Sequence, residues 1–372
     1  MKHTLFITHH YLTGNGGGVF ASRAYINAFC ELSESVTLLY PIKNDEAAEG
    51  LNPKVKCIPV SYDKPKAIKF LDLLFGRLHR YFGCIEKYLA SGEYDTVVFD
   101  TSLVTWKSID IAKQYGIKVI TIHHNYQYEY CRDNTTGVVK LLTLFWIKRY
   151  ERNAVRKSDL NLTLTNDDRN LLKRHYDPTG ASLIEVLGVF EPERRVLPNI
   201  KTKTRGGNYI ITGSLSAMQT YESLKEWIKG YFPILKSQNC FKSLTIAGKD
   251  PSEKLVDLCR RNGITVVANP VSMDEVLENA DVYICPVSLG GGLKLRIMDG
   301  LRFGLPVICH KVSTRGYEPF IDKCMFTYDD EKSFSLFIES YKIEITAYDI
   351  QNMYFKFFSF QSGLERLKQY LT

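Results

Sequence analysis

The strongest constraint on the fold of this chain is a regular alternation of short apolar runs and helical patterns. Strand-like runs of the first half lie at 4–8, 35–40, 54–60, 95–100, 118–123, 160–165 and 182–189. Those of the second half lie at 208–214, 243–248, 264–269, 281–287 and 305–310. Strands that alternate with helices predict parallel sheets covered by helices on both faces, and their nearly continuous apolar character fits strands buried on both sides.

A segment rich in proline, glycine and charge, 191–207, interrupts the alternation, and 372 residues exceed the usual length of one domain. We therefore predict an α/β chain with two doubly wound, Rossmann-like domains, over 1–190 and 208–347, joined by a linker over 191–207. The aromatic-rich tail, about 348–372, is expected to form a helix that crosses back to the first domain. Two such domains facing each other would leave a cleft at the carboxyl ends of both sheets.

Composition narrows the functional classes. None of the nine cysteines forms a C-x-x-C pair, so the sequence predicts no metal site, and cysteines within apolar runs suit a reducing cytoplasm. The N-terminus lacks the features of a secretory signal, and no apolar run approaches the ~20 residues needed to span a bilayer. The formal net charge of +7 favours anionic partners, but basic residues spread over both halves argue against nucleic acid.

A glycine-rich turn followed by cations is the main candidate binding site, in SLGGGLKLRIMDGLRFGLPV over 288–307. The turn consists of Gly290, Gly291 and Gly292, which would let a ligand approach the backbone. A helix is expected over about 293–303, with Lys294 and Arg296 in its first turn. Positive charge there costs roughly 0.3–1 kcal/mol per residue, and a bound phosphate would reverse that cost.

Asp299 lies three residues after Arg296 and hence on nearly the same helix face. A carboxylate in that position can accept hydrogen bonds from the paired hydroxyls of a ribose. The alternative interpretation is a flexible loop before an ordinary amphipathic helix with a solvated charged face.

The segment 286–308 resembles the signature of GT-B glycosyltransferases, especially the retaining family 4 group (glycosyl transferases group 1). Segments 212–228, 243–250 and 266–287 are similar to other strand–helix units of that family's C-terminal domain. The resemblance implies the GT-B fold, with two Rossmann-like domains facing across a cleft, and a nucleotide-sugar donor, UDP-linked by expectation. It implies neither a metal nor a cofactor beyond that donor.

The resemblance also assigns residues. Asp299 matches the second of the family's two acidic residues, which contacts the donor ribose, whereas Gly291 stands in place of the first. Ser214 stands where the family has its phosphate-binding arginine, so Lys294 and Arg296 are expected to carry the diphosphate charge instead. The full set of expected nucleotide-binding residues is Gly17, Gly18, Gly213, Ser214, Asn269, Gly290, Gly291, Gly292, Leu293 and Asp299.

The first half contributes two further features. Gly16, Gly17 and Gly18 precede a helix expected to begin near Val19, and the resemblance implies a loop that closes near the donor phosphate; a plain turn is the alternative. His123 and His124 end the strand-like run 118–123, and only one of them can face the cleft. By register His123 matches the family histidine near the reaction centre, so the expected catalytic residues are His123, Lys294 and Arg296.

The leading functional prediction is a metal-independent, retaining glycosyltransferase that acts on a glycan or lipid-linked sugar acceptor in bacterial surface polysaccharide synthesis. Alternatives are a catalytically silent GT-B protein that binds carbohydrate or a partner, and a sugar-nucleotide epimerase.

Segment 138–157 pairs an apolar face with six Lys/Arg against Glu151, a charge of +5. Such a helix either lies on an anionic membrane at the inner face or packs into the first domain with a solvated edge.

Overall fold

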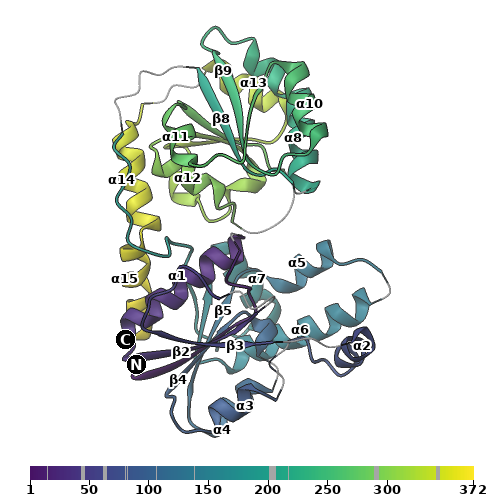
Figure 1. Cartoon of the computed structure of the whole chain (residues 1–372), viewed down its shortest axis with the longest axis vertical. Coiled ribbons are helices and arrows are strands. Elements are labelled where there is room, and N and C mark those ends of the chain that lie inside the picture. The colour runs from purple at the N-terminus through teal and green to yellow at the C-terminus, as the bar shows by residue number, and fades with distance from the viewer. Residues whose placement is uncertain are drawn as a thin grey trace. The chain divides into compact units, whose positions relative to one another are not determined.

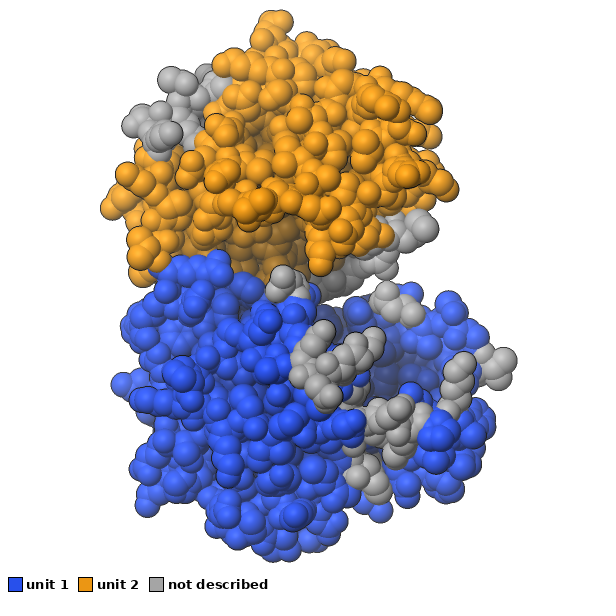
Figure 2. Space-filling model, in the orientation of Figure 1, with its two compact units in different colours: residues 1–195, 359–372 blue, residues 196–358 orange. Residues whose placement is uncertain are grey.

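The structure is a computed structural model that describes residues 1–14, 16–42, 47–61, 65–79, 81, 83–105, 107–137, 139–200, 207–216, 218–288, 293–340 and 344–372. The chain divides into two compact units, which Figure 2 colours separately. Unit 1 comprises Met1–Arg195 with Ser359–Thr372, and unit 2 comprises Val196–Phe358. Each unit contains one parallel sheet with its own core.

The sheet of unit 1 has seven strands in the order β3-β2-β1-β4-β5-β6-β7, and every neighbouring pair is parallel. Its strands are β1 (His3–Thr8), β2 (Ser35–Pro41), β3 (Val55–Val60), β4 (Thr96–Asp100), β5 (Lys118–His123), β6 (Leu160–Thr163) and β7 (Ile184–Val186). The central strands β1, β4 and β5 are almost wholly buried, as their continuous apolar runs predict.

Helices cover both faces of this sheet (Figure 1). They are α1 (Gly17–Leu32), α2 (Lys66–Leu74), α3 (Ile85–Leu89), α4 (Ser108–Gln114), α5 (Gln127–Asn134), α6 (Lys140–Lys157), α7 (Asn166–Tyr176) and α15 (Phe360–Leu371). One face packs against α3, α4 and α6 around Ile85, Ile109 and Ala154, and the other packs against α1, where Phe29 meets Phe6 of β1. A short 3-10 turn, η1 (Ser102–Val104), follows β4.

The sheet of unit 2 has six parallel strands in the order β10-β9-β8-β11-β12-β13. They are β8 (Asn208–Ser214), β9 (Ser243–Lys249), β10 (Thr265–Ala268), β11 (Val282–Cys285), β12 (Val307–His310) and β13 (Met325–Tyr328). The sequence patterns predict every one of these strands except β13. Both sheets have the strand order of doubly wound folds, so the predicted fold class is confirmed.

The helices of unit 2 also lie on both faces of its sheet (Figure 1). They are α8 (Met218–Gly230), α9 (Phe232–Lys236), α10 (Glu253–Asn262), α11 (Met273–Glu278), α12 (Arg296–Arg302), α13 (Glu331–Ser340) and α14 (Ala347–Phe358). Trp227 of α8 and Phe334 of α13 anchor the core on one face of the sheet. Within the described ranges, none of the helices combines the length and apolar character that a bilayer crossing requires.

The tail differs from the single helix expected over 348–372. It forms two helices, α14 in unit 2 and α15 in unit 1, because Ser359 adopts an extended conformation and its hydroxyl caps α15 by accepting from the Ser362 amide at 3.1 Å. Within unit 1, Arg366 of α15 donates to the Leu187 carbonyl at 3.0 Å, and Gly363 lies against the ring of Phe190. The last helix alone therefore belongs to the first unit.

Candidate active site

The strand order of each sheet sets where a ligand can enter. In unit 1 the chain leaves β1 toward β2 on one side, and later returns to β4 on the other side. In unit 2, β8 lies between β9 and β11 in the same way. At such a switch point the loops after the two central strands separate, so a crevice opens at the carboxyl ends of the strands. The residues at the ends of β1 and β4 in unit 1, and of β8 and β11 in unit 2, are therefore the candidates for a binding site.

In unit 2, Arg296 lies directly over the end of β8. A Cβ atom placed on Gly213 would stand 2.6 Å from Cζ and Nη1 of Arg296, so the guanidinium occupies the space that any other residue at 213 would fill. Arg296 begins α12, which starts three residues later than the sequence predicts. Lys294 consequently precedes the helix instead of lying in its first turn. The structure thus brings together Gly213 and Arg296, two of the predicted site residues that are 83 positions apart in the sequence.

Tyr283 of β11 holds α12 in that position. Its hydroxyl lies 2.7 Å from Thr212 Oγ1 on β8, and a Cβ on Gly300 of α12 would stand 2.6 Å from its ring. Only glycine at 300 lets α12 approach the aromatic ring this closely. Burial raises the pKa of Tyr283 well above its ordinary value, while the nearby Arg296 opposes that rise. The buried tyrosine therefore stays neutral and serves as a hydrogen-bonded spacer below the guanidinium.

Lys294 lies close enough to two arginines to feel their charge. Burial lowers the pKa of Lys294, and repulsion from Arg296 and Arg315 lowers it further. The Lys294 carbonyl accepts a hydrogen bond from the buried Tyr317 hydroxyl at 2.9 Å, which fixes the backbone just before α12. Since like charges held together raise each other's energy, a bound anion would relieve the repulsion among them. Arg315 was not among the sequence-predicted residues, and a lone arginine in a turn gives no signal for it.

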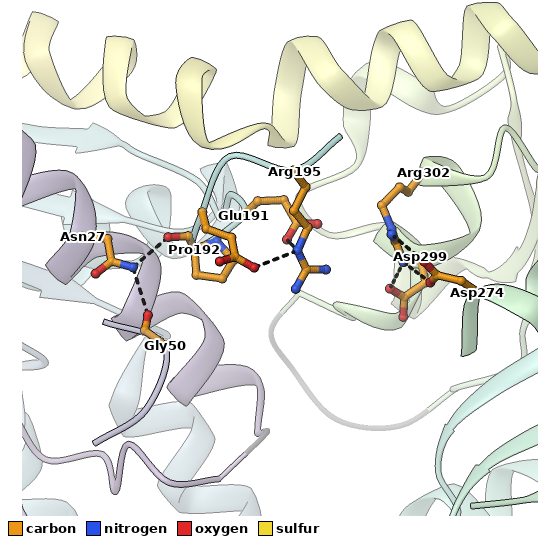
Figure 3. A network of polar contacts seen from close by, with 9 residues as sticks. Asn27, Gly50, Glu191, Pro192, Arg195, Asp274, Asp299 and Arg302 are labelled. Atoms are coloured by element: carbon orange, nitrogen blue, oxygen red, sulfur yellow. Dashed lines mark hydrogen bonds and ion pairs between the residues drawn. The ribbon is translucent and has the colours of Figure 1, made fainter. Parts of the chain in front are cut away.

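Asp299 lies one turn along α12, near the ion pair between the buried Arg302 and the half-exposed Asp274 (Figure 3). Arg302 is 8% exposed, and its Nη2 lies 2.8 Å from Asp274 Oδ1 and 4.0 Å from Asp299 Oδ1. The Arg302 carbonyl accepts from Gln351 Nε2 at 3.0 Å. The Asp299 side chain remains 47% exposed, so its carboxylate is oriented by Arg302 yet accessible to a ligand.

The remaining candidates of unit 2 have different surroundings. Asn269 adopts a left-handed backbone with φ +48°, and its side-chain oxygen accepts from the Asp250 amide at 2.9 Å, so its side chain shapes the turn after β10. Ser214 is exposed, with its hydroxyl 3.2 Å from that of Ser216. Leu293 is half-buried. Gly290, Gly291 and Gly292 lie outside the described residues.

In unit 1, a glycine in the first turn of α1 lies against a histidine. Gly17 is the first residue of α1, and a Cβ on Gly18 would stand 2.4 Å from Cε1 of His10, which follows β1. His10 Nε2 is buried and has no hydrogen-bond partner among the described residues. Burial and the imidazoles of His9 and His124 lower the pKa of His10 well below its ordinary value, so this ring is neutral near neutral pH.

The adjacent histidines at the end of β5 point to opposite faces of the sheet. His123 is 1% exposed, and its Nε2 lies 3.0 Å from Asn161 Oδ1 on β6, whose amide in turn donates to the Val155 carbonyl of α6. Burial lowers the pKa of His123 to about 4. His124 instead lies beside α1, with its ring centroid 5.9 Å from that of Tyr25. Of the two, His124 is therefore the one that lies at the switch point.

A buried carboxylate organises this corner of unit 1. Asp100 ends β4 with no exposed surface, and its Oδ1 lies 2.5 Å from His124 Nε2. Its Oδ2 accepts hydrogen bonds from the hydroxyls of Thr8, at 2.6 Å, and Ser22. Burial alone would raise the pKa of Asp100, but His124, His10 and the Ser22 hydrogen bond hold it well below its usual range. The sequence analysis missed Asp100, although an acidic residue that closes the buried run TVVFD is a recognisable signal.

Among known proteins, a sequence family matches only a stretch of unit 2, whereas solved structures match the whole chain. Residues 208–339 match the model of the family described as Glycosyl transferases group 1. No curated protein sequence matches the chain.

Several solved structures share the fold over the whole chain. The lipopolysaccharide outer core galactosyltransferase WaaB, in its apo form, is 13% identical with a TM-score of 0.68, covering 100% of this chain and 99% of that one. A mutant of S. aureus TarM in complex with Fondaparinux, α-GlcNAc-glycerol and UDP is 9% identical with a TM-score of 0.67, over 100% of both chains. Anabaena HepE in complex with UDP and glucose is 11% identical with a TM-score of 0.61, over 99% of both.

These likenesses define the class of protein: the chain has the GT-B fold, built from two Rossmann-like α/β units. Residues 208–339, about a third of the chain, match the family model of the glycosyl transferases group 1. The family resemblance inferred from the segment 286–308 is therefore confirmed. Glycosyl transfer is the class of reaction that this family name denotes.

Proposed function

We propose that this chain transfers a sugar, with retention of anomeric configuration, from a nucleotide sugar to a glycan or lipid-linked sugar in bacterial surface polysaccharide synthesis. The proposed donor is UDP-linked, which is supported by the UDP in the solved complexes of TarM and HepE. The reaction is proposed to proceed in the cytoplasm and to need neither a metal nor a further cofactor.

The observation that carries the proposal is the Arg296 guanidinium at the end of β8, together with Lys294, which lies close enough to Arg296 and Arg315 for both arginines to lower its pKa. When the glycosidic bond breaks, negative charge builds up on the departing diphosphate. Cations already held in place stabilise that charge without reorganising at the moment of reaction, which is often the largest contribution to catalysis. Here the Arg296 guanidinium fills the space beside Gly213, Tyr283 packs against Gly300 of the same helix, and Tyr317 holds the backbone at Lys294.

The other residues have proposed parts around that charge. The carboxylate of Asp299, which is 47% exposed, is proposed to accept hydrogen bonds from the donor ribose. Gly17 and Gly18 are proposed to approach the donor phosphate, and the acceptor hydroxyl is proposed to lose its proton to a departing phosphate oxygen. The expected role of His123 beside the sugar stays a prediction, and the placement of His124 at the switch point makes it the matched residue to compare.

The test is nucleotide binding and turnover. Calorimetric titration with UDP, GDP and their sugars should show selective binding of one nucleotide, and Arg296→Ala should weaken it at least about tenfold, as expected for loss of a charge-assisted contact of roughly 1.5–3 kcal/mol. Arg261→Ala, an exposed arginine on α10, is the matched control and should bind as the wild type does. Failure to bind any nucleotide, or equal affinity in both variants, would overturn the proposal.

Turnover separates the alternatives. A retaining glycosyltransferase hydrolyses its donor slowly without an acceptor. With an acceptor it rapidly transfers the sugar to the acceptor hydroxyl, and the product keeps the anomeric configuration of the donor. Nucleotide binding without any turnover over a panel of donors and acceptors would favour the catalytically silent binder. Conversion of the donor into an epimer, with no acceptor present, would identify the epimerase.

Contact with an anionic membrane is proposed for one face of α6. Leu141 and Phe145 are 79% and 57% exposed, and Arg149, Arg152 and Arg156 continue the same helix face. The basic half of this face borders a pocket of ≈ 500 Å³, which Lys107 and Lys157 also line. Helix α2, which packs against α6, adds Phe70 and Leu71, each about half exposed. Apolar side chains that precede a cationic stretch suit the interface of an anionic bilayer.

A further inference from the structure

Two histidines and one aspartate meet in unit 1 with their ligand atoms turned toward one another. His10 follows β1, Asp100 ends β4 and His124 follows β5, and one nitrogen or oxygen atom from each lies within 4.8 Å of the other two. The three residues come from three different segments of the chain, so the arrangement is a product of the sheet and not of a local turn. We propose that His10, Asp100 and His124 bind a divalent transition-metal ion of the zinc type, independently of the nucleotide site proposed in unit 2.

The donor set fits such an ion. Imidazole nitrogen and carboxylate oxygen are the ligands that zinc takes at about 2.0–2.2 Å, and sites with three protein ligands leave the fourth position to a water or another ligand. His10 is half-buried, while His124 and Asp100 are buried. The fourth position would therefore lie on the side of His10.

The outer contacts of Asp100 already have the form that a ligating carboxylate needs. Thr8 and Ser22 both donate to Oδ2, which leaves Oδ1 directed at His124 Nε2. Hydrogen bonds of this kind orient ligands and tune metal sites, and their removal typically lowers metal affinity about 10–100-fold. In the metal-free protein a proton holds His124 Nε2 against Asp100 Oδ1, and the ion would replace that proton.

A second, independent observation points to a missing partner. His10 Nε2 is buried, and among the described residues it has no hydrogen-bond partner. A buried polar atom without a partner costs free energy, so its retention beside a carboxylate and a second imidazole calls for an explanation. The amide ends of α1 begin at Gly17 and disfavour a cation nearby, but the full negative charge of the buried Asp100 opposes that effect.

The structural consequence concerns the start of α1. Gly18 lies against the His10 ring, so an ion that fixes His10 also fixes the first turn of α1 relative to β4 and β5. The ion would thus connect the loop after β1, which carries His10, to the ends of β4 and β5, which carry Asp100 and His124. This role does not require the ion to take part in glycosyl transfer.

The experiment is metal binding by the full chain after treatment with a chelator and desalting. Zn²⁺ titrated by calorimetry should bind at one equivalent, and Co²⁺ should give the visible bands of nitrogen and oxygen ligation without the near-ultraviolet absorption of a thiolate. His10→Gln should weaken binding at least about tenfold while it leaves the contact between Asp100 and His124 in place. His9→Gln changes the adjacent residue outside the triad, so it should retain wild-type affinity.

The far-ultraviolet circular dichroism of both variants checks that they are folded. Binding that is equal in wild type and folded His10→Gln, binding with thiolate absorption, or no binding of Zn²⁺ and Co²⁺ would each overturn the assignment. His124→Gln provides a second ligand deletion from another segment. It should lose affinity as His10→Gln does, and unchanged binding there would equally contradict the site.

Discussion

Gly213 and Arg296 are in contact such that the guanidinium of one fills the place where the other would carry a side chain. A Cβ at position 213 would overlap Cζ and Nη1 of Arg296 at 2.6 Å. The end of β8 and the start of α12 are therefore matched to each other, and the position of the positive charge depends on the absence of a methyl group. This relationship makes the glycine, as much as the arginine, a residue of the proposed diphosphate site.

Gly213→Ala should weaken binding of the nucleotide by displacing the guanidinium. The single variants Gly213→Ala and Arg296→Ala should each lower affinity at least about tenfold, and the double variant should bind no more weakly than Arg296→Ala. Calorimetric titration with UDP measures all four proteins. Additive losses in the double variant would show that the methyl group acts on the ligand without moving Arg296.

Asp299 and Arg302 should separate ligand binding from stability. Asp299→Asn removes a carboxylate that is 47% exposed, so it should weaken binding of UDP more than binding of inorganic pyrophosphate and leave thermal stability nearly unchanged. Arg302→Ala removes a buried guanidinium and leaves Asp274 without its partner. Because Asp274 is half exposed, we expect Arg302→Ala to lower the free energy of unfolding by about 1–3 kcal/mol, less than the loss of a fully buried pair would cost.

Chemical denaturation measures the stability of each variant, and calorimetric titrations with UDP and with pyrophosphate measure its two affinities. If Asp299→Asn lowered the affinities for UDP and pyrophosphate equally, the proposed contact with the ribose would be wrong. If Arg302→Ala were as stable as the wild type, the ion pair in Figure 3 would contribute nothing to unit 2.

Glu151 should make the stability of unit 1 depend on pH. Its carboxylate is fully buried in α6, where it accepts from the amides of Gln127 and Tyr128 at 2.6 and 3.1 Å and from the Tyr176 hydroxyl at 3.0 Å. Burial nevertheless raises the pKa of Glu151 from an ordinary value of 4.5 to about 8. The unfolded chain then loses this proton at lower pH than the folded chain does.

The contribution of Glu151 to the free energy of unfolding is therefore fully present below pH 4.5. It declines as the pH rises to about 8, by at most ~1.4 kcal/mol per pH unit. Urea denaturation of wild type and Glu151→Gln between pH 5 and pH 8 should give curves of unfolding free energy that differ in slope. Glu86→Gln, an exposed glutamate on α3, should follow the wild type. Parallel curves for wild type and Glu151→Gln would contradict the raised pKa.

The exposed face of α6 should mediate binding to anionic vesicles. Replacing Leu141 and Phe145 by Ser removes apolar area that is largely exposed, so the fold should be retained while vesicle binding falls several-fold. Replacing Arg149 and Arg152 by Gln should reduce binding to phosphatidylserine-containing vesicles, by ~1 kcal/mol per charge, and more so at low salt.

Vesicle sedimentation with neutral phosphatidylcholine is the matched comparison. Leu336→Ser, an exposed apolar residue on α13 of unit 2, should bind as the wild type does. Equal sedimentation of all variants with both kinds of vesicle would argue for the alternative, a helix packed into unit 1 with a solvated edge.

Much of this protein could be predicted from local pattern. The apolar runs predict every strand of unit 1, and the Gly-rich segment with Lys294, Arg296 and Asp299 is recognisable because its residues lie within ten positions of one another in the sequence. The ends of the helices differ from the sequence prediction. Helix α12 begins at Arg296 and not at Leu293, and the tail breaks at Ser359, whose hydroxyl caps α15. Local sequence signals favour such ends without determining the exact residue.

The sequence by itself determined the alternation of strands and helices, the parallel sheets and the place of the cationic segment, because burial and period act over a few residues at a time. Only the tertiary structure decided which of His123 and His124 lies beside Asp100, and that Arg296 rests on Gly213. Thr8 and Asp100 bond across 92 positions. Such contacts follow from strand order and from the face that each residue occupies, so they arise only when distant segments pack together.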